Sequence, residues 1–554
     1  MQRLFTLPCL LLIVMLGIYI LPASTMKAET APARPFPQRV TYAANTIRPT
    51  NFTQSQQDQH VRSFYDYWKA NYLVAAGTNS AGKQMYRVAF GTGSPVTVSE
   101  GQGYGMVIVA LMAGHDPDAK VLFDGLWYFS RQFPSGIDNC LMSWKIENGQ
   151  IVDGNDSAFD GDVDIAYGLL LADAQWGSSG VVNYTSEANR VIAGILASTI
   201  GPQSRLPMLG DWVNPNGSPH NQYTPRSSDF MPAHFRAFGR ATGNSVWVDV
   251  INKSELTINS IQAKAGATTG LLPDFLNCSS NYNCSPANAG FLEGPNDGNY
   301  YYNAGRDPWR IGLDALLNND ADARAQVQQM VNWLVSDTQG QADNIKAGYT
   351  LDGTPIGDYF TTFFVAPFGV AAMTDPSKQA FLNDIYASVY NTRESYFEDS
   401  VNLLALLAMT GNYWDPTAGG GMAPTSTPIN ATPVPPTSTP PVPTPPTPVP
   451  GDGCQVDYTI GDDWSTGFTA QVTITNNGST AMDGWTLTWE FSGNQQITQM
   501  WNASSSQSGT QVSATNAGWN ATIPAGGSVS FGFHGTYSGT NKAPTEFTLN
   551  GSGC

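Results

Sequence analysis

Residues 425–450 read TSTPINATPVPPTSTPPVPTPPTPVP, and this stretch decides how the chain is organised. Proline fixes φ and removes an amide donor, so such a sequence cannot build a packed core. The longer segment 416–450 contains no charged side chain. We therefore expect 416–450 to be an extended, semi-rigid linker between two folded units, residues 35–415 and residues 452–554.

The first unit carries apolar residues at helical spacing along most of its length, and few of its segments alternate with period two. A ring of six helical hairpins, an (α/α)6 barrel, accounts for about a dozen helices, whereas a solenoid requires a fixed-length repeat that is not seen. We expect an all-α unit with helices over residues 61–74, 103–113, 121–133, 163–175, 186–200, 230–241, 246–265, 309–317, 323–335, 359–372, 378–390 and 400–409.

The second unit switches to a period of two. Its alternating segments are QVTIT (471–475), GWTLTWEF (484–491) and SVSFGF (528–533). Turn sequences rich in Asn and Gly separate them. About a hundred residues of short strands with such turns predict an all-β sandwich.

The composition favours an uncharged, flat partner. Only 13% of residues are charged, while 11% are aromatic, including 14 Trp and 23 Tyr. The formal net charge of −18 argues against nucleic acid, because like charges repel, but it does not exclude a cationic polymer. Nothing in the sequence indicates an oligomer, so we expect a monomer.

The first residues resemble an export signal. Arg3 precedes an apolar run over 7–20, and small residues follow as far as Ala28. The run is shorter than the roughly 18–20 apolar residues of a membrane span, and no other segment reaches that length. We predict that residues 1–28 are removed and that the protein is secreted, without membrane attachment; the alternative is an uncleaved anchor.

Export permits disulfides. One of the six cysteines leaves with the signal. Cys454 and Cys554 bracket the second unit and are expected to form a disulfide. Cys278 and Cys284 are close enough in sequence to form a second disulfide within one loop. Cys140 then has no partner and is expected to be a buried thiol. The sequence contains no CxxC or HExxH motif and its five His are scattered, so we expect no metal and no cofactor.

The first acidic motif is SEGQGYGM (99–106), in which Glu100 enters an apolar helix and three glycines clear space beside it. A carboxyl group against an apolar wall has a raised pKa, as a general acid requires. The alternative is a helix-start Glu that only stabilises the helix dipole.

The second motif is FDGDVDIAYGLLLA (159–172). Asp160, Asp162 and Asp164 alternate before an apolar helix, and three anions are more than a helix cap needs. A calcium loop is the alternative, but its ligand pattern does not continue.

The third motif is FLEGPNDGNYYYNAGRDPWR (291–310), where Glu293 precedes a Tyr triplet and two arginines. Aromatic faces stack on sugar rings, and arginines orient carboxylates. The alternative is a surface loop with aromatic packing. Hydrolysis of a glycosidic bond needs one carboxyl group as acid and another as base. The three motifs supply such carboxyl groups together with aromatic residues that can serve as platforms for sugar rings.

Together the three motifs resemble glycoside hydrolase family 8, over roughly residues 50–415. The resemblance implies an (α/α)6 barrel and an inverting, endo-acting hydrolase. Phe159 departs from the family pattern, which usually has Ser or Thr there, but the departure affects no carboxylate.

The resemblance implies that Glu100 is the general acid and that Asp160 binds and distorts the sugar beside the scissile bond. Many members place the base where this chain has Asn303, which cannot take up a proton. A subgroup with lichenases, chitosanases and some cellulases instead uses a Glu ten residues earlier, here Glu293, with Asn303 and Arg306 in support. Inversion implies that the two catalytic carboxyl groups lie about 6.5–9.5 Å apart.

Four aromatic residues of the first unit are expected to bind sugar rings: Trp144, Trp212, Tyr302 and Tyr396. Packing in the core is the alternative for the two tryptophans.

The second unit resembles a family 2 carbohydrate-binding module over its whole length. Trp464, Trp501 and Trp519 match the exposed strip that stacks on cellulose in that family, while Trp485 and Trp489 are expected in the core. We therefore predict an endo-β-1,4-glucanase that acts on cellulose or mixed-linkage β-glucan. A chitosanase is the first alternative, and a non-catalytic cellulose adhesin, suggested by Asn303, is the second.

Overall fold

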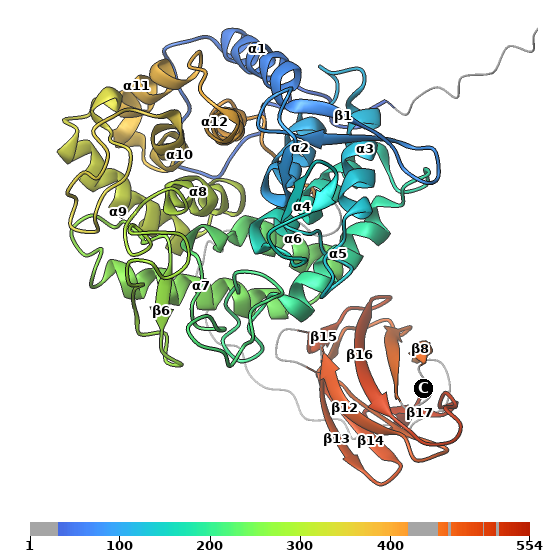
Figure 1. Ribbon diagram of the computed structural model, residues 1–554. Coiled ribbons are helices and arrows are strands. Elements are labelled where there is room, and N and C mark those ends of the chain that lie inside the picture. Colours follow the sequence, from blue (N-terminus) through green and yellow to red (C-terminus); the bar gives the residue numbers. More distant parts are fainter. Residues whose placement is uncertain (1–30, 419–452, 464–466, 502, 517–519) are drawn as a thin grey trace, which may run out of the picture.

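The computed structural model describes residues 31–418, 453–463, 467–501, 503–516 and 520–554 (Figure 1). Within these ranges the first unit contains twelve α-helices, as expected from the periodicity. They are α1 (Gln54–Tyr72), α2 (Ser99–Leu111), α3 (Ala119–Gln132), α4 (Phe159–Trp176), α5 (Tyr184–Ser198), α6 (Pro232–Thr242), α7 (Val246–Gln262), α8 (Asp307–Asn318), α9 (Ala321–Asp337), α10 (Thr362–Ala372), α11 (Gln379–Val389) and α12 (Tyr396–Met409).

The even-numbered helices form an inner ring. Each packs against the next, from α2 to α4, α6, α8, α10 and α12, and α12 closes the ring on α2. The odd-numbered helices lie outside, with α1 against α12, α3 against α2, α5 against α4, α7 against α6, α9 against α8 and α11 against α10 (Figure 1). The all-α (α/α)6 barrel predicted from the sequence is therefore confirmed.

The sequences of the helices explain which ring each one joins. Every residue of α10, TFFVAPFGVAA, is buried, and in α2 only Glu100 is not. A helix that is apolar all round must be enclosed by protein. By contrast α3, AKVLFDGLWYFSRQ, buries one face and leaves charged residues on the other, as suits an outer helix.

Helices α1, α2, α4 and α12 start four or more residues earlier than their apolar residues indicate. Helix α1 begins at Gln54, where Thr53 and Gln56 form a capping box, because its first turns are polar and give no hydrophobic signal. Helix α4 begins at Phe159, so Asp160, Asp162 and Asp164 lie inside the helix and not before it. Asp160 and Asp164 pair with arginines from elsewhere in the chain and Asp162 accepts a distant backbone N–H, partners that periodicity cannot reveal.

Short strands lie in the connections between the helices of the first unit. They form a hairpin of β1 (Leu73–Thr78) and β2 (Gln84–Val88), a sheet of β3 (Val96–Val98), β4 (Lys145–Glu147) and β5 (Gln150–Ile151), and a hairpin of β6 (Leu276–Cys278) and β7 (Cys284–Pro286). A disulfide joins Cys278 to Cys284 across the last hairpin. Cys140 has no disulfide partner among the described residues and is half-buried, where a buried thiol was expected.

The second unit consists of antiparallel strands, and the predicted all-β sandwich is confirmed. One sheet has the order β13-β14-β11-β17-β18, the other β12-β16-β9-β8, and β10 pairs with β15. The strands are β8 (Cys454–Asp463), β9 (Gly467–Asn476), β10 (Met482–Asp483), β11 (Thr486–Glu490), β12 (Gln496–Trp501), β13 (Ala503–Ser508), β14 (Gln511–Asn516), β15 (Thr522–Ile523), β16 (Ser528–Thr536), β17 (Phe547–Leu549) and β18 (Ser552–Gly553).

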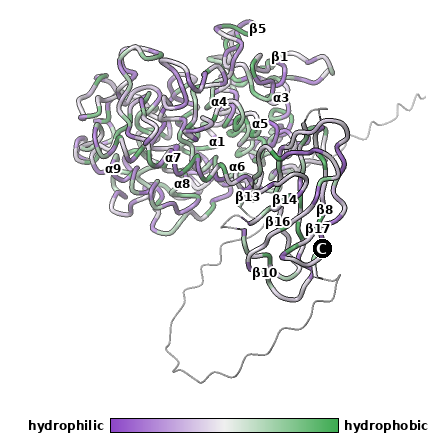
Figure 2. The backbone as a smooth tube through the Cα atoms, turned by 90° about the horizontal axis from the view of Figure 1, so that it is seen from below, coloured by the Kyte–Doolittle hydropathy of each residue, from purple (hydrophilic) through white to green (hydrophobic). Residues whose placement is uncertain are grey.

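The inward faces of the two sheets share one apolar core. Trp485 and Trp489 are buried in it, as expected, together with Phe531 and Phe533. In Figure 2 hydrophobic residues of this unit appear as short green stretches between white and purple ones. A disulfide between Cys454 and Cys554 joins the two ends of the unit.

Several predictions concern parts of the chain outside the described residues. These are the signal at 1–28, most of the linker, and the side chains of Trp464, Trp501 and Trp519. Among the helices that the structure does describe, none has the length and apolar character needed to cross a membrane.

Candidate active site

Arg306 connects two of the predicted carboxylates. It ends the short 3-10 helix η2 (Ala304–Arg306) and is buried. Its Nη1 donates to Glu100 Oε2 at 2.5 Å and to Asp160 Oδ2 at 2.8 Å. Glu100 is the second residue of α2 and Asp160 the second of α4, so packing of these helices brings both carboxylates to one arginine.

The two carboxyl groups have pKa values shifted in opposite directions. Burial raises the pKa of Glu100 to about 7, an effect that Arg306 opposes and Asp160 reinforces. Burial also acts to raise the pKa of Asp160, but the guanidinium groups of Arg306 and Arg226 outweigh it and lower that pKa. Near neutral pH this pair offers one carboxyl group that holds a proton and one that is ionised, the pattern of an acid beside a charged partner.

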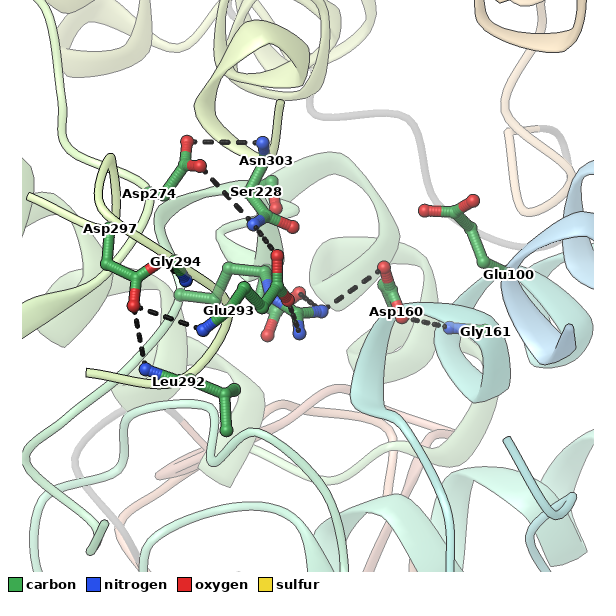
Figure 3. Close-up of polar contacts among 12 residues, drawn as sticks. Glu100, Asp160, Gly161, Ser228, Asp274, Leu292, Glu293, Gly294, Asp297 and Asn303 are labelled. Atoms are coloured by element: carbon green, nitrogen blue, oxygen red, sulfur yellow. Dashed lines mark hydrogen bonds and ion pairs between the residues drawn. The ribbon is translucent and has the colours of Figure 1, made fainter. Parts of the chain in front are cut away.

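Glu293 lies in the loop that follows β7 and has a side chain that is 49% exposed, against 18% for Glu100. Asn303 Nδ2 donates to its Oε2 at 2.8 Å, and Arg226 Nη2 donates to its Oε1 at 3.3 Å. Figure 3 shows Glu293 and Glu100 on opposite sides of Asp160. The structure thus brings together Glu100, Asp160, Glu293, Asn303 and Arg306, which the sequence named separately.

Asn303 is held by both its backbone and its side chain. Asp274 Oδ1 accepts the N–H groups of Tyr301, Asn303 and Ala304, at 3.0, 3.1 and 2.7 Å. Asn303 Oδ1 accepts from Arg306 Nη2 at 2.9 Å, which turns its Nδ2 toward Glu293. Burial raises the pKa of Asp274 to about 7, although the three N–H groups act against this.

Sequence reasoning missed Arg226, which bridges two of the site's carboxylates. Its Nη1 lies 3.5 Å from Asp160 Oδ2, and its Nη2 donates to Glu293. It also missed Ser228, which accepts from Arg306 at 2.9 Å, and Asp274. Arg226 and Ser228 lie in PRSSDF (225–230), and nothing in that segment indicates partners that are distant along the chain.

The other two aspartates of the second motif bind other partners. Asp164 pairs with Arg310 Nη2 at 2.5 Å and lies 3.1 Å from His234 Nε2. Asp162 accepts the backbone N–H of Met142 at 2.8 Å. Both contacts tie α4 to its neighbours, so only Asp160 of the three contributes to the site.

Three of the predicted sugar platforms keep accessible ring surface. Trp212 is 37% exposed and packs edge-on against His220. Trp144 is half-buried and donates from Nε1 to the Asp153 carbonyl at 2.9 Å. Tyr302 is half-buried, and its ring stacks on Phe363.

Tyr396, the fourth predicted platform, is buried. The ring of Phe90 stacks on it at a centroid distance of 4.5 Å, and Phe90 itself is 46% exposed. The accessible aromatic ring on this side is therefore that of Phe90, which lies between β2 and β3 and which no motif marked.

One group of carboxylates in the described part of the chain is close enough to share a metal ion: Glu255, Asp320 and Asp322. Arg236 Nη2 already lies among them, 2.6 Å from Asp320 and 3.7 Å from Glu255. A cation is thus supplied by the protein itself.

Comparison with known proteins assigns each of the two units to a family. The family described as Glycosyl hydrolases family 8 matches residues 42–411, and the Cellulose binding domain family matches residues 454–554. The chain is 42% identical to a beta-glucanase of Niallia circulans over 402 residues, which is 72% of this chain and 95% of that protein.

Two further comparisons, one for each unit, agree with these family assignments. The structure named as the apo form of a beta-1,3-1,4-glucanase from Paenibacillus sp. X4 has 42% sequence identity and a TM-score of 0.66, and the match covers 70% of this chain and all of that one. The last hundred or so residues are 55% identical, over 102 residues, to part of Exoglucanase A of Cellulomonas fimi, covering 18% of this chain and 12% of that protein. The chain therefore belongs to glycoside hydrolase family 8 and carries a C-terminal cellulose binding domain, as its three motifs and its tryptophan pattern predicted.

Proposed function

We propose that this chain is a secreted, inverting endo-β-1,4-glucanase that hydrolyses cellulose, mixed-linkage β-glucan or both. The observation that supports it most is a line of three contacts, Glu100 to Arg306, Arg306 to Asn303 and Asn303 to Glu293, at 2.5, 2.9 and 2.8 Å. Two carboxyl groups kept apart by intervening side chains leave room for a water molecule, which an inverting glycosidase needs.

Glu100 is the proposed general acid. Its raised pKa, about 7, keeps it protonated in mildly acidic solution, where it can donate to the glycosidic oxygen. Arg306 holds the carboxyl group in place and limits how far burial raises the pKa.

Glu293 is the proposed base. Its half-exposed carboxylate can hold a water molecule, while Asn303 and Arg226 fix its orientation. The water oxygen bonds to the anomeric carbon as the glycosidic bond breaks, Glu293 takes a proton from the water, and the leaving oxygen takes the proton of Glu100. Glu293 then releases its proton to solvent and Glu100 regains one, so the cycle balances.

Asp160, Asn303 and Arg306 are proposed to bind the sugar beside the scissile bond. Asp160 stays ionised between two guanidinium groups and presents acceptors to sugar hydroxyls. Trp144, Trp212 and Tyr302 are proposed to stack on sugar rings further along the polysaccharide. Phe90 is proposed to do so in place of Tyr396, whose ring it covers.

The remaining assignments concern the organisation of the chain. We propose that residues 1–28 direct secretion, that 35–415 are catalytic, that 416–450 are a linker and that 452–554 bind cellulose through Trp464, Trp501 and Trp519. The protein is proposed to act as a monomer.

A substrate panel tests the proposed reaction. Reducing ends are measured on carboxymethylcellulose, barley β-glucan, chitosan and xylan, and the anomeric form of the first product is followed by proton NMR. We expect cleavage of the two glucans with release of the α-anomer. Preferential cleavage of chitosan, which the net charge of −18 would suit, would replace the glucanase by a chitosanase, and release of the β-anomer would exclude inversion.

A second experiment tests the binding domain. Trp519→Ala should weaken adsorption to crystalline cellulose by about tenfold while cleavage of soluble β-glucan stays near the wild-type rate. Equal losses in adsorption and cleavage would show that the domain does not act independently.

A further inference from the structure

Asp297 makes an unusual set of contacts with the loop that carries Glu293. Its buried carboxylate accepts three consecutive backbone N–H groups (Figure 3). Leu292 and Glu293 donate to Oδ2 at 2.7 and 3.1 Å, and Gly294 donates to Oδ1 at 2.9 Å. One side chain thus fixes the backbone on both sides of Glu293 as well as at Glu293 itself.

Two further contacts hold the loop here: Gly290 donates its N–H to the Gly294 carbonyl at 2.7 Å, and His220 Nε2 lies 3.1 Å from the Phe291 carbonyl. Residues 287–299 form no helix or strand, and both Leu292 and Glu293 are exposed. In the described part of the chain, the Glu293 side chain is held by Asn303 and Arg226 alone. Without Asp297, the three N–H groups would turn to solvent, and the backbone at Glu293 would lose three of the hydrogen bonds that hold it.

Asp297 is in turn tied to the residue that holds Asn303. Phe275 donates its N–H to the carbonyl of Asp297 at 2.9 Å, and the neighbouring Asp274 donates its N–H to Asn299 at 2.8 Å. Asp274 also accepts the three N–H groups around Asn303. Asp274 and Asp297 are both buried, and backbone hydrogen bonds connect the segments that carry them. Because Asp297 holds the backbone of Glu293 and Asp274 holds that of Asn303, the two aspartates fix the spacing between Glu293 and Asn303.

We propose that Asp297 is a positioning residue that places the Glu293 carboxylate for attack by water. The proposal rests on the role of Glu293 as base. An error of about 1 Å in a reacting group can cost on the order of 100-fold in rate, so the effect should fall on turnover and not on binding. Asparagine has the same shape and keeps one acceptor oxygen, but its amide nitrogen would present donors to at least one N–H group that needs an acceptor.

The test is Asp297→Asn in the full-length protein, assayed on barley β-glucan. We expect kcat to fall by about 10- to 100-fold with KM within about twofold of wild type. Asp352→Asn is the matched control, because Asp352 also accepts a backbone N–H, from Thr354 at 3.1 Å, in an exposed turn. A kcat within twofold of wild type, or a loss confined to KM, would overturn the proposal.

A double-mutant cycle separates positioning from general stability. If Asp297 acts through Glu293, Asp297→Asn should have almost no further effect on kcat in the Glu293→Gln background. Additive losses would overturn the proposal, while near wild-type activity of Glu293→Gln alone would instead overturn the role of Glu293. Should Asp297→Asn not fold, Asp297→Ser, which keeps one acceptor oxygen, takes its place in the same cycle.

Discussion

Glu100 and Glu293 are held in opposite ways. Glu100 sits in the first turn of an inner helix, where α4, α12 and Arg306 enclose it. Glu293 sits in a loop without regular structure, where the side chains of Asn303, Arg226 and Asp297 fix it by hydrogen bonds. Packing and an ion pair with Arg306 position the first carboxyl group, and hydrogen bonds in an open loop position the second.

The difference matches the two proposed tasks. A general acid must keep its proton, and burial in a packed ring raises the pKa of Glu100 to do so. A base must hold water, and a loop leaves Glu293 half-exposed to it. Rigid packing and solvent access, which one element cannot easily supply together, are thus divided between a helix and a loop.

The largest expected effect separates the two roles by leaving group. Glu100→Gln and Glu293→Gln should each lower kcat on β-glucan by about 10²–10⁴-fold. On dinitrophenyl cellobioside, whose leaving group needs no proton, Glu100→Gln should recover most of its rate and Glu293→Gln should not. Glu187→Gln, on the outer helix α5, is the control. Equal behaviour of both variants on the activated substrate would break the distinction.

The second prediction concerns packing around the two carboxylates. A Cβ at Gly101 would overlap the hydroxyl and ring of Tyr396, whereas a Cβ at Gly294 would meet no atom within 4 Å. Gly101→Ala should therefore lower the free energy of unfolding by about 1–3 kcal/mol. Gly294→Ala should change it by less than about 0.5 kcal/mol. Thermal denaturation checks both, and similar stability of the two variants would show that the acid side is no more tightly packed than the base side.

The smallest expected effect is a shift in the pH profile. Because Glu100 must be protonated, kcat/KM should fall as the pH rises through about 7. The charge of Asp160 raises the pKa of Glu100, so Asp160→Asn should lower that pKa and move the alkaline limb to lower pH. The pH dependence of the residual kcat/KM of Asp160→Asn, compared with that of the wild type, checks this shift. An unchanged limb, or a shift to higher pH, would mean that another group controls it.

The acid side was more readable from the sequence than the base side. Glu100 stands at the start of an apolar helix with glycines beside it, so the local pattern made it a candidate, with a structural role at the helix start as the alternative. Glu293 stands in a loop with no periodicity, and its selection depended on likeness to a family. Arg226, Asp274 and Asp297 went unrecognised as partners, since each acts on residues brought near it by folding.

The periodic parts of the fold were predicted well, because an apolar stripe must be buried whatever it packs against. The errors have physical causes. Helices α1 and α4 extend into polar turns that a hydrophobic pattern does not detect. Tyr396 is an aromatic residue of the type that stacks on sugars, yet the ring of Phe90, from a loop about three hundred residues earlier, covers it.

By itself the sequence determined the two units, the helix and strand periods, the family and the residues that can carry charge at the site. The tertiary structure alone decided which carboxylate lies buried against Arg306, which one stays open to water and which aspartates hold the loop. The physical reason is that hydrophobic burial is specified locally by residue type and spacing, whereas pKa and position depend on charges and donors that meet only after the ring of helices closes.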